Sequence, residues 1–379
     1  MLPTLAIVGA LNQSRYDTTN TFTKFQFGVQ NFWDANVFLR LSQPLYHQEY
    51  WTQLDLTDNQ IAQAEAEYAA EQQNLLLRVA KAYFAVLAAE DNAGFTNAET
   101  HALEQQLRQI KQFYAAGTVA NTDLREAQSA FDQASAAEIA AQRGLHVAQA
   151  ALQEIIGQVD FKLNPLREEL PLDPPSPANI QEWGAMAQQN NLAILAAENR
   201  AEVARKSIDL QSFGHLPSLD MVGNVGITDT DRPAGLVSNS QSFGVQLNMP
   251  LFQGGSVSSR VRQARSQFEA AKESVDRERR AVRRQVQDAY DGILFSIGQV
   301  RALKTVVESS RAAVDATEAS LRVGTRTMVD VTTMQRNFSK AQRDDAQARY
   351  EYVINGLLLK QGAGSLGKED LAAVNSWLH

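Results

Sequence analysis

Two short stretches combine a glycine with hydroxyl and charged side chains, the residue types that build ion pairs and hydrogen-bonded links. One reads VGTRTMVDV, in which Gly324 precedes Arg326, and the other reads AGTVANTDL, in which Gly117 precedes Thr122 and Asp123. A guanidinium group is a planar fork that forms several charge-assisted hydrogen bonds at once. One stretch supplies this donor and the other supplies acceptors, so the two stretches are chemically complementary.

The rest of the sequence carries no pattern for catalysis or metal binding. The absence of cysteine excludes disulfides, thiolate nucleophiles and thiolate metal ligands. No phosphate-binding loop is present, and three carboxylates at helical spacing among alanines predict a solvated helix face: Glu65, Glu67 and Glu71. The five histidines, none of which has metal-ligand spacing, are His47, His101, His146, His215 and His379. We therefore expect no enzyme, no cofactor and no metal.

Composition narrows the class of protein further. The 379 residues carry a net charge of −8, which argues against nucleic-acid binding because that needs a basic surface. The sequence contains no run of 18 apolar residues, so we expect no transmembrane helix. The N-terminus lacks the basic and apolar regions of a signal peptide. The sequence therefore belongs either to a cytosolic protein or to a chain without its natural start.

The sequence repeats itself at a distance of about 207 residues. LSQPLY at 41–46 matches LNMPLF at 247–252, and AAGTVANTDL at 115–124 matches RVGTRTMVDV at 322–331. Because further matches follow in the same order, we expect two copies of one structural unit.

Each copy begins with segments that alternate between apolar and other residues. In SFGVQLNMP, Phe243, Val245 and Leu247 alternate with Gly244 and Gln246. A period of two predicts a strand, and about ten residues suffice to cross a bilayer in a β-barrel. The strands alone favour a simpler alternative, a soluble hairpin with one buried face. The aromatic-rich stretch at 21–33 predicts an external loop within the first hairpin.

Each copy then continues as a very long helix. Apolar residues between 261 and 321 recur in steps of three and four, and residues 251–379 contain no proline. This spacing is typical of coiled-coil packing. A helix of some 65 residues would extend about 100 Å, far more than a soluble globular domain needs.

These patterns predict a first repeat at 1–157, a proline-rich linker at 158–179, a second repeat at 180–367 and a short C-terminal helix at 368–379. The expected elements of the two repeats are a β-hairpin at 2–44, a long helix at about 48–114, a returning helix at about 121–156, a helix at 180–213, a β-hairpin at 217–250, a long helix at about 255–321 and a returning helix at about 328–361. The helix at 180–213 has no counterpart before the first hairpin, so we expect that an N-terminal helix and an export signal are missing.

This layout resembles the TolC family of outer-membrane channel proteins, most specifically in VGTRTMVDV and in ARYEYVINGLLLKQGAGSLG at 348–367. The resemblance implies a mainly α fold with a membrane β-barrel portion, in a homotrimer that shares a 12-stranded β-barrel and a periplasmic α-helical barrel. Four strands cannot close a barrel, and an open edge cannot face lipid, whereas twelve strands enclose a lumen.

The resemblance also implies the function, the location and the partners. The protein would be the passive exit duct of a tripartite efflux or type I secretion system, in the bacterial outer membrane and spanning the periplasm. Its partners would be a periplasmic adaptor protein, an inner-membrane RND or ABC transporter, and outer-membrane lipid. Whether such a duct serves drugs, metals or secreted proteins stays open.

The resemblance implies that the turns at Gly117 and Gly324 lie at the periplasmic tip, where the channel narrows. Asp330 would then appear three times in a ring that attracts multivalent cations. The family has a second aspartate ring where this sequence has Thr333, so cation binding should be weaker here. The alternative is that Asp330 only caps the start of a helix.

The resemblance also implies that Arg326, Asp123 and Thr122 form a latch between neighbouring helix pairs. The tyrosine of that family network corresponds to Leu321 here, so one link is absent. A plain surface role is the alternative, since exposed ion pairs contribute under about 1 kcal/mol.

Aromatic residues directly after the strands predict an interfacial girdle, with packing between helices as an equal alternative. They are Tyr46, Tyr50, Trp51 and Phe252. A soluble coiled-coil scaffold or adaptor protein is the alternative function. It explains the helices but not the alternating strands at matching positions of both repeats.

Overall fold

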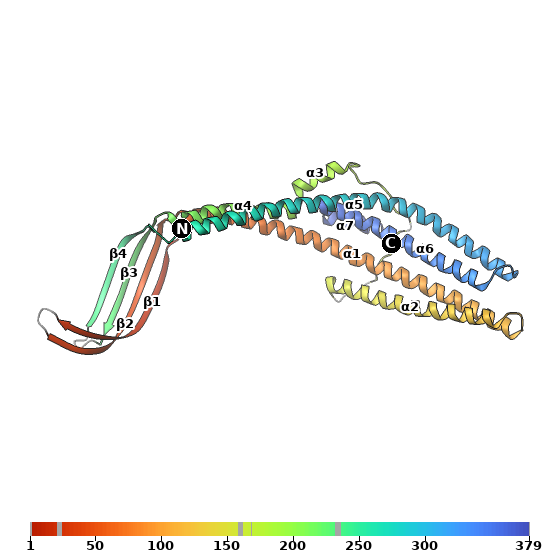
Figure 1. Cartoon of the computed structure of the whole chain (residues 1–379), viewed down its shortest axis with the longest axis horizontal. Helices are drawn as coiled ribbons and strands as arrows, with labels where there is room; N and C mark the ends of the chain where they lie inside the picture. Colours follow the sequence, from red (N-terminus) through yellow and green to blue (C-terminus); the bar gives the residue numbers. More distant parts are fainter. Residues whose placement is uncertain (1, 21–24, 158–161, 168, 232–235, 379) are drawn as a thin grey trace. The chain divides into compact units, whose positions relative to one another are not determined.

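The computed structural model describes all residues except 1, 21–24, 158–161, 168, 232–235 and 379. The elements (Figure 1) are β1 Thr4–Asn20, β2 Phe25–Tyr46, α1 Gln48–Ala115, α2 Asn121–Ile156, α3 Ile180–Asn190, α4 Leu192–Ser212, η1 Phe213–His215, β3 Ser218–Thr230, β4 Leu236–Asn248, α5 Ser256–Arg322, α6 Met328–Gly362 and α7 Lys368–Asn375. None of the described helices is long and apolar enough to cross a bilayer.

The chain forms two compact units, and each of them uses segments of both sequence repeats. The first unit contains Met1–Gln63 and Glu198–Ser274, and the second contains Ala64–Ala197 and Val275–His379. The sequence repeat is therefore not a compact unit by itself.

In the first unit, the four strands form one antiparallel sheet in the order β1-β2-β3-β4. The two hairpins join through β2 and β3, where Leu39 stands opposite Val225 and Val37 opposite Ile227. Residues opposite each other share a face of a sheet. One face is therefore rich in large apolar residues, and the other carries mostly polar and small ones.

The first hairpin is longer than the sequence predicts. Strand β2 begins at Phe25 instead of after 33, and Trp33 pairs with Gln13 of β1. The expected external loop at 21–33 is therefore wrong for residues 25–33, while residues 21–24 lie outside the described part. Aromatic and β-branched side chains favour strands. The aromatic residues that we interpreted as a loop signal therefore extend the strand.

The long helices follow the sequence prediction closely. Helix α1 covers Gln48–Ala115 and α5 covers Ser256–Arg322, against about 48–114 and about 255–321. No proline lies in either helix, so each runs until a glycine ends it in a left-handed conformation. Gly117 has φ 72° and Gly324 has φ 77°, which are values that other residues adopt only with strain.

The expected continuous helix at 180–213 is wrong, because it breaks at Asn191 between α3 and α4. The side chain of Asn191 accepts hydrogen bonds from the amides of Ala193 and Ile194, and it donates one to the carbonyl of Gly362. Nearby, a Cβ on Gly364 would lie only 2.2 Å from the Asn190 carbonyl oxygen. The break therefore results from a tertiary contact between α3–α4 and the end of α6.

The main core of the second unit holds the linker in place. It packs residues from α1, α3, α5 and α6 together, including Phe84, Trp183, Val286 and Tyr350. Tyrosine hydroxyls fix the linker itself, since Tyr83 donates to Asn164 and Tyr352 donates to Pro171 and Asp173. Because these three backbone carbonyls have partners, the linker can lie against the helices at these points.

Candidate functional site

The two glycine turns in the second unit have nearly the same geometry. The hydroxyl of Thr118 donates to the Phe113 carbonyl at 2.9 Å, and that of Thr325 donates to the Ser320 carbonyl at 3.1 Å. The amide of each threonine donates to the same carbonyl. Each turn thus satisfies helix-end carbonyls that would otherwise lack a partner.

Each returning helix starts with an aspartate that caps the backbone. A carboxylate oxygen of Asp123 accepts from the amide of Ala120 at 3.2 Å, and one of Asp330 accepts from the amide of Thr327 at 2.9 Å. Only the second helix has a hydroxyl at its N-cap, where Thr327 accepts from the Asp330 amide at 3.3 Å. The capping alternative for Asp330 is therefore present in the structure. The cap uses Oδ2, and Oδ1 is the oxygen that faces Arg326.

The hydrogen bonds from Thr327 lower the pKa of the exposed Asp330 carboxyl, and the nearby Arg326 guanidinium lowers it further. Arg326 Nη1 lies 3.8 Å from Asp330 Oδ1. Within one chain, the ion pair of Arg326 is thus with Asp330 and not with Asp123.

The two turns nevertheless share one groove. It has a volume of about 530 Å³, and both Asp123 and Arg326 line it. Its wall includes Met328, the first residue of α6. This side chain is only 5% exposed and packs with Leu107 and Ile110 of α1 and Ala127 of α2. The helical hairpin α1–α2 and the helical hairpin α5–α6 are therefore joined at the tip by an apolar contact beside the charged residues.

The sequence did not single out this anchor. Met328 stands where the first repeat has Asn121, and that difference between the repeats is the signal that could have found it. A second tie between the hairpins is the hydrogen bond from Arg336 to Gln133, at 2.8 Å.

The remaining predicted tip residues lie on the surface. Thr122 and Thr333 are exposed, and the Thr333 hydroxyl donates to the Val329 carbonyl in its own helix at 2.8 Å. Thr122 does not line the groove that holds Asp123 and Arg326. The constriction and the latch both remain predictions, because each concerns several copies of the chain.

The apolar face of the sheet in the first unit is open. Ile7 is 77% exposed and Phe243 is 73% exposed. The other large apolar residues exposed on the same face include Leu5, Leu11, Val37, Leu39, Val225, Ile227, Val245 and Leu247. Contiguous apolar surface of this kind marks contact with lipid or with another protein.

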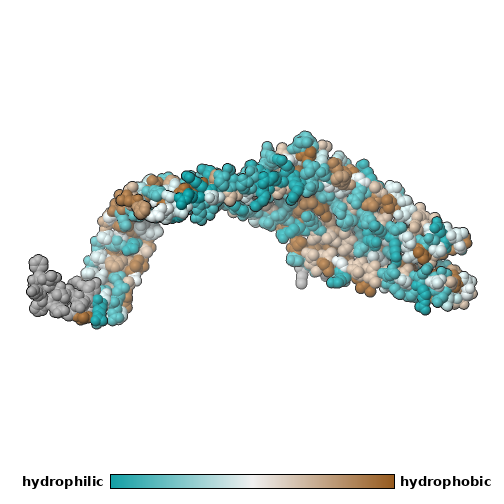
Figure 2. Space-filling model, in the orientation of Figure 1, coloured by the Kyte–Doolittle hydropathy of each residue, from teal (hydrophilic) through white to brown (hydrophobic). Residues whose placement is uncertain are grey.

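Apolar residues also gather where the strands meet the helices, as Figure 2 shows. Trp51 is 59% exposed and Phe252 is 88% exposed, and Tyr46 and Tyr50 are exposed as well. The alternative was that these residues pack between helices. Within one chain, the exposure of Trp51 and Phe252 argues against it, whereas Tyr50 lines a cavity with Leu210 of α4 and Arg260 of α5.

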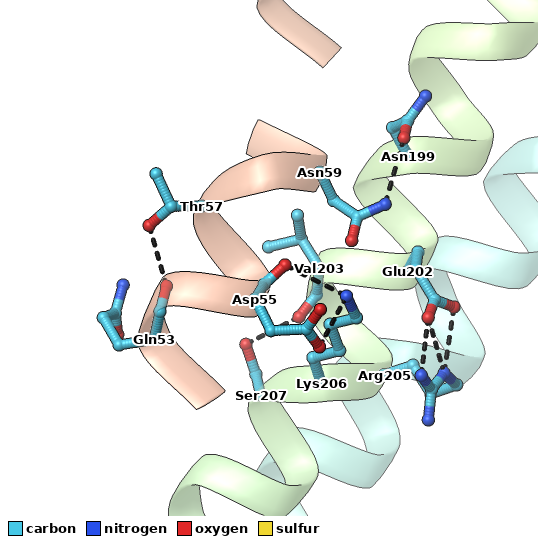
Figure 3. A network of polar contacts seen from close by, with 10 residues as sticks. All are labelled: Gln53, Asp55, Thr57, Asn59, Asn199, Glu202, Val203, Arg205, Lys206 and Ser207. Carbon is cyan, nitrogen blue, oxygen red and sulfur yellow. Dashed lines mark hydrogen bonds and ion pairs between the residues drawn. The ribbon is translucent and has the colours of Figure 1, made fainter. Parts of the chain in front are cut away.

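Polar contacts join α1 to α4 in the first unit (Figure 3). Lys206 Nζ lies 2.7 Å from Asp55 Oδ2, and Asn59 donates to Asn199 at 3.2 Å. On the same helix, Arg205 forms a bidentate pair with Glu202 and lowers the pKa of that carboxyl. The contacts of Lys206 with Asp55 and of Asn59 with Asn199 hold the two helices side by side.

The fold is that of outer-membrane channel subunits, which combine a β-barrel portion with long helices that form an α-barrel. The chain matches the crystal structure of the Campylobacter jejuni CmeC outer membrane channel with a TM-score of 0.78 and 15% identity, over 100% of this chain and 82% of that one. At this identity the similarity is one of fold.

Sequence similarity identifies the family. The profile of the family "Outer membrane efflux protein" matches residues 1–158 and 183–365. The outer membrane protein TolC of Vibrio cholerae is 39% identical over 345 residues, which are 90% of this chain and 79% of that protein. The alkaline protease secretion protein AprF of Pseudomonas aeruginosa is 27% identical over 99% of this chain and 79% of its own length.

The chain therefore belongs to the outer membrane efflux protein family, a family of channel proteins. It is an outer-membrane protein and an efflux or type I secretion channel, as the sequence resemblance implied.

Proposed function

We propose that three copies of this chain form a passive exit duct that conducts cargo from an inner-membrane transporter across the periplasm and the outer membrane. The three sheets join through their edge strands β1 and β4 into one 12-stranded barrel. The helices enclose a periplasmic duct, and the glycine turns lie at its closed end.

The observation that carries this proposal is the exposed apolar face of a four-stranded sheet. Both outer strands of the sheet are edges within the chain. Edge strands have unpaired backbone groups that lipid cannot satisfy, so a sheet that faces lipid must close on itself. In a soluble scaffold or adaptor protein, another protein would have to cover this surface.

Planar lipid bilayers test the function directly. The purified protein should run as a trimer that needs detergent, and it should insert as discrete conducting steps. A detergent-free, soluble elongated species without conducting steps would favour the scaffold alternative.

At the tip, we infer that three copies of Asp330 form a cation-binding ring. Like charges held close together attract multivalent cations, and only one oxygen of each carboxylate is used by the cap. Asp330→Ala should therefore abolish block by divalent or trivalent ions added on the periplasmic side. Asp344→Ala, a substitution on the same helix about four turns away, is the control and should leave block unchanged. Persisting block in Asp330→Ala would exclude the ring.

A periplasmic adaptor protein and an RND or ABC transporter are the proposed partners. Support comes from the relatives, since one is named an alkaline protease secretion protein and another an outer membrane efflux protein. The groove between the two hairpin tips is the proposed docking surface for the adaptor. Because no phosphate-binding loop occurs in the sequence, we propose that the transporter supplies the energy and that this chain carries out no catalysis.

A further inference from the structure

The end of strand β2 lacks part of its backbone pairing. Pro44 stands opposite Asp220 of β3, and the register shifts between Pro44 and Tyr46, so that Leu45 is an extra residue. Proline has no amide hydrogen to donate, and a bulge interrupts the ladder. Other groups must therefore fasten this strand end, which leads through His47 directly into α1.

His47 supplies that fastening from the single residue between strand and helix. Its Nε2 lies 3.0 Å from Asp220 Oδ1 on β3, and its Nδ1 lies 3.3 Å from Glu49 Oε1 in the first turn of α1. The ring stacks on Tyr50, with centroids 4.6 Å apart, and its side chain is only 10% exposed. The imidazole is thus held between two carboxylates in a largely enclosed position.

Counting protons shows which form of the ring fits these contacts. An ionised carboxylate only accepts hydrogen bonds, and a neutral imidazole has one N–H to donate. Both ring nitrogens can donate only when the ring is a cation. In the neutral ring, one nitrogen lone pair would face a carboxylate oxygen, which is repulsive.

One further charged group near this site is on α5. Arg260 and Glu49 line the same cavity of about 330 Å³, together with Tyr50 and Gly214. Arg260 donates to Gln253 Oε1 at 3.5 Å, whereas Asp220 has only its link to the histidine among the described contacts. The contact with Asp220 is the one that should depend most on the proton.

We infer that His47 is a proton-operated clamp between the sheet and the first long helix. When the ring is protonated, it joins Asp220 of β3 to Glu49 of α1 and closes the gap left by the bulge. The clamp loosens when the ring loses its proton, because the neutral ring can donate to only one of the two carboxylates. This device is independent of the gate at the helical turns and adds a second point of control, at the junction of strands and helices.

Hydrogen–deuterium exchange of the full-length protein in detergent tests the clamp, at pH 5.5 and at pH 8 after correction for intrinsic exchange rates. In the unaltered protein, amides of 45–49 and 219–221 should exchange about tenfold faster at pH 8, since hydrogen bonds to charged groups are the strong ones. His47→Gln should exchange rapidly at both pH values.

Asp220→Asn provides the second variant. Its amide can donate to a neutral imidazole, so slow exchange should persist at pH 8 and the pH effect should shrink. A purely structural contact would not show this rescue. His101→Gln is the matched control, because His101 also has a carboxylate neighbour, Glu104, at 3.8 Å but lies exposed in the C-terminal part of α1. It should leave exchange at 45–49 unchanged.

Equal corrected exchange at both pH values in the unaltered protein would overturn the proposal. A full pH effect in Asp220→Asn, or its loss in His101→Gln, would overturn it too. None of these outcomes bears on conductance, so failure of the clamp is distinguishable from failure of the proposed channel function.

Discussion

The two helical turns share a backbone and differ in chemistry. At equivalent positions, both have a glycine with positive φ, a threonine that donates to the helix end and an aspartate that caps the next helix. Only the second turn has an arginine, a hydroxyl at the N-cap and a buried methionine. The shared residues are those that the chain reversal needs. The differences are where a gate can acquire its specific contacts.

The largest expected effect concerns the apolar anchor. Met328→Ala should destabilise closure of the tip by about 2–3 kcal/mol, because it empties a buried site. Asn121→Ala, at the equivalent exposed position of the first turn, should change it by under about 0.5 kcal/mol. Native-state hydrogen exchange of the two tips measures both. Equal effects would mean that the two turns do not differ in packing.

The glycines should respond alike and thereby define what the turns share. Gly117→Ala and Gly324→Ala should each cost about 1–2 kcal/mol, since both glycines have positive φ. Gly298→Ala is the control, because this glycine is exposed inside α5 with open space around it. It should stabilise the helix by about 0.5–1 kcal/mol. Thermal unfolding in detergent distinguishes the expected loss of stability in the turn variants from the expected gain in the control. A large difference in stability between the two turn variants would contradict the shared geometry.

Substitutions at the two N-cap positions test a smaller difference between the turns, the hydroxyl that only α6 has at its start. Thr327→Ala should cost about 1 kcal/mol at the start of α6, because the N-cap hydroxyl is lost. Ala120→Thr should stabilise the start of α2 by up to a similar amount. Hydrogen exchange at the first turn of each helix provides the measurement. If the variants with equalised caps still differ, then the cap does not account for the asymmetry.

The smallest expected change in free energy comes from the arginine. Arg326→Ser or Asp123→Ala should raise the resting conductance and antibiotic entry without lowering the yield of trimer. Exposed ion pairs contribute under about 1 kcal/mol, so the open fraction should rise severalfold at most. A double variant no more open than either single variant would support one shared link. Single variants that conduct like the parent would assign closure to packing at Met328 alone.

Sequence patterns predicted the helices well because their signals are local. Absence of proline, steps of three and four, and glycines at 117 and 324 set the ends of α1 and α5 to within a few residues. The break at Asn191 could not be predicted in this way, since its cause is the carbonyl of Gly362, 171 residues away.

At the tip, too, contacts between residues close in sequence could be predicted and contacts between distant residues could not. Asp330 and Thr327 are three positions apart, so the capping alternative was visible in the sequence. The burial of Met328 was not, because it depends on Leu107 and Ile110 in the other hairpin. The pairing of Arg326 with Asp330 rather than Asp123 within one chain is also a matter of geometry that composition does not determine.

The pairing of β2 with β3 has a consequence for the order of events during folding. Arg40 and Asn224 are hydrogen-bonded neighbours although 184 residues separate them. Each hairpin can form from nearby residues, whereas joining the two requires the closure of a very long loop, which is slow. A nascent chain that emerges from its N-terminus therefore has half a sheet until residue 230 has appeared. The complete sheet therefore forms late, after the long loop between the two hairpins has closed.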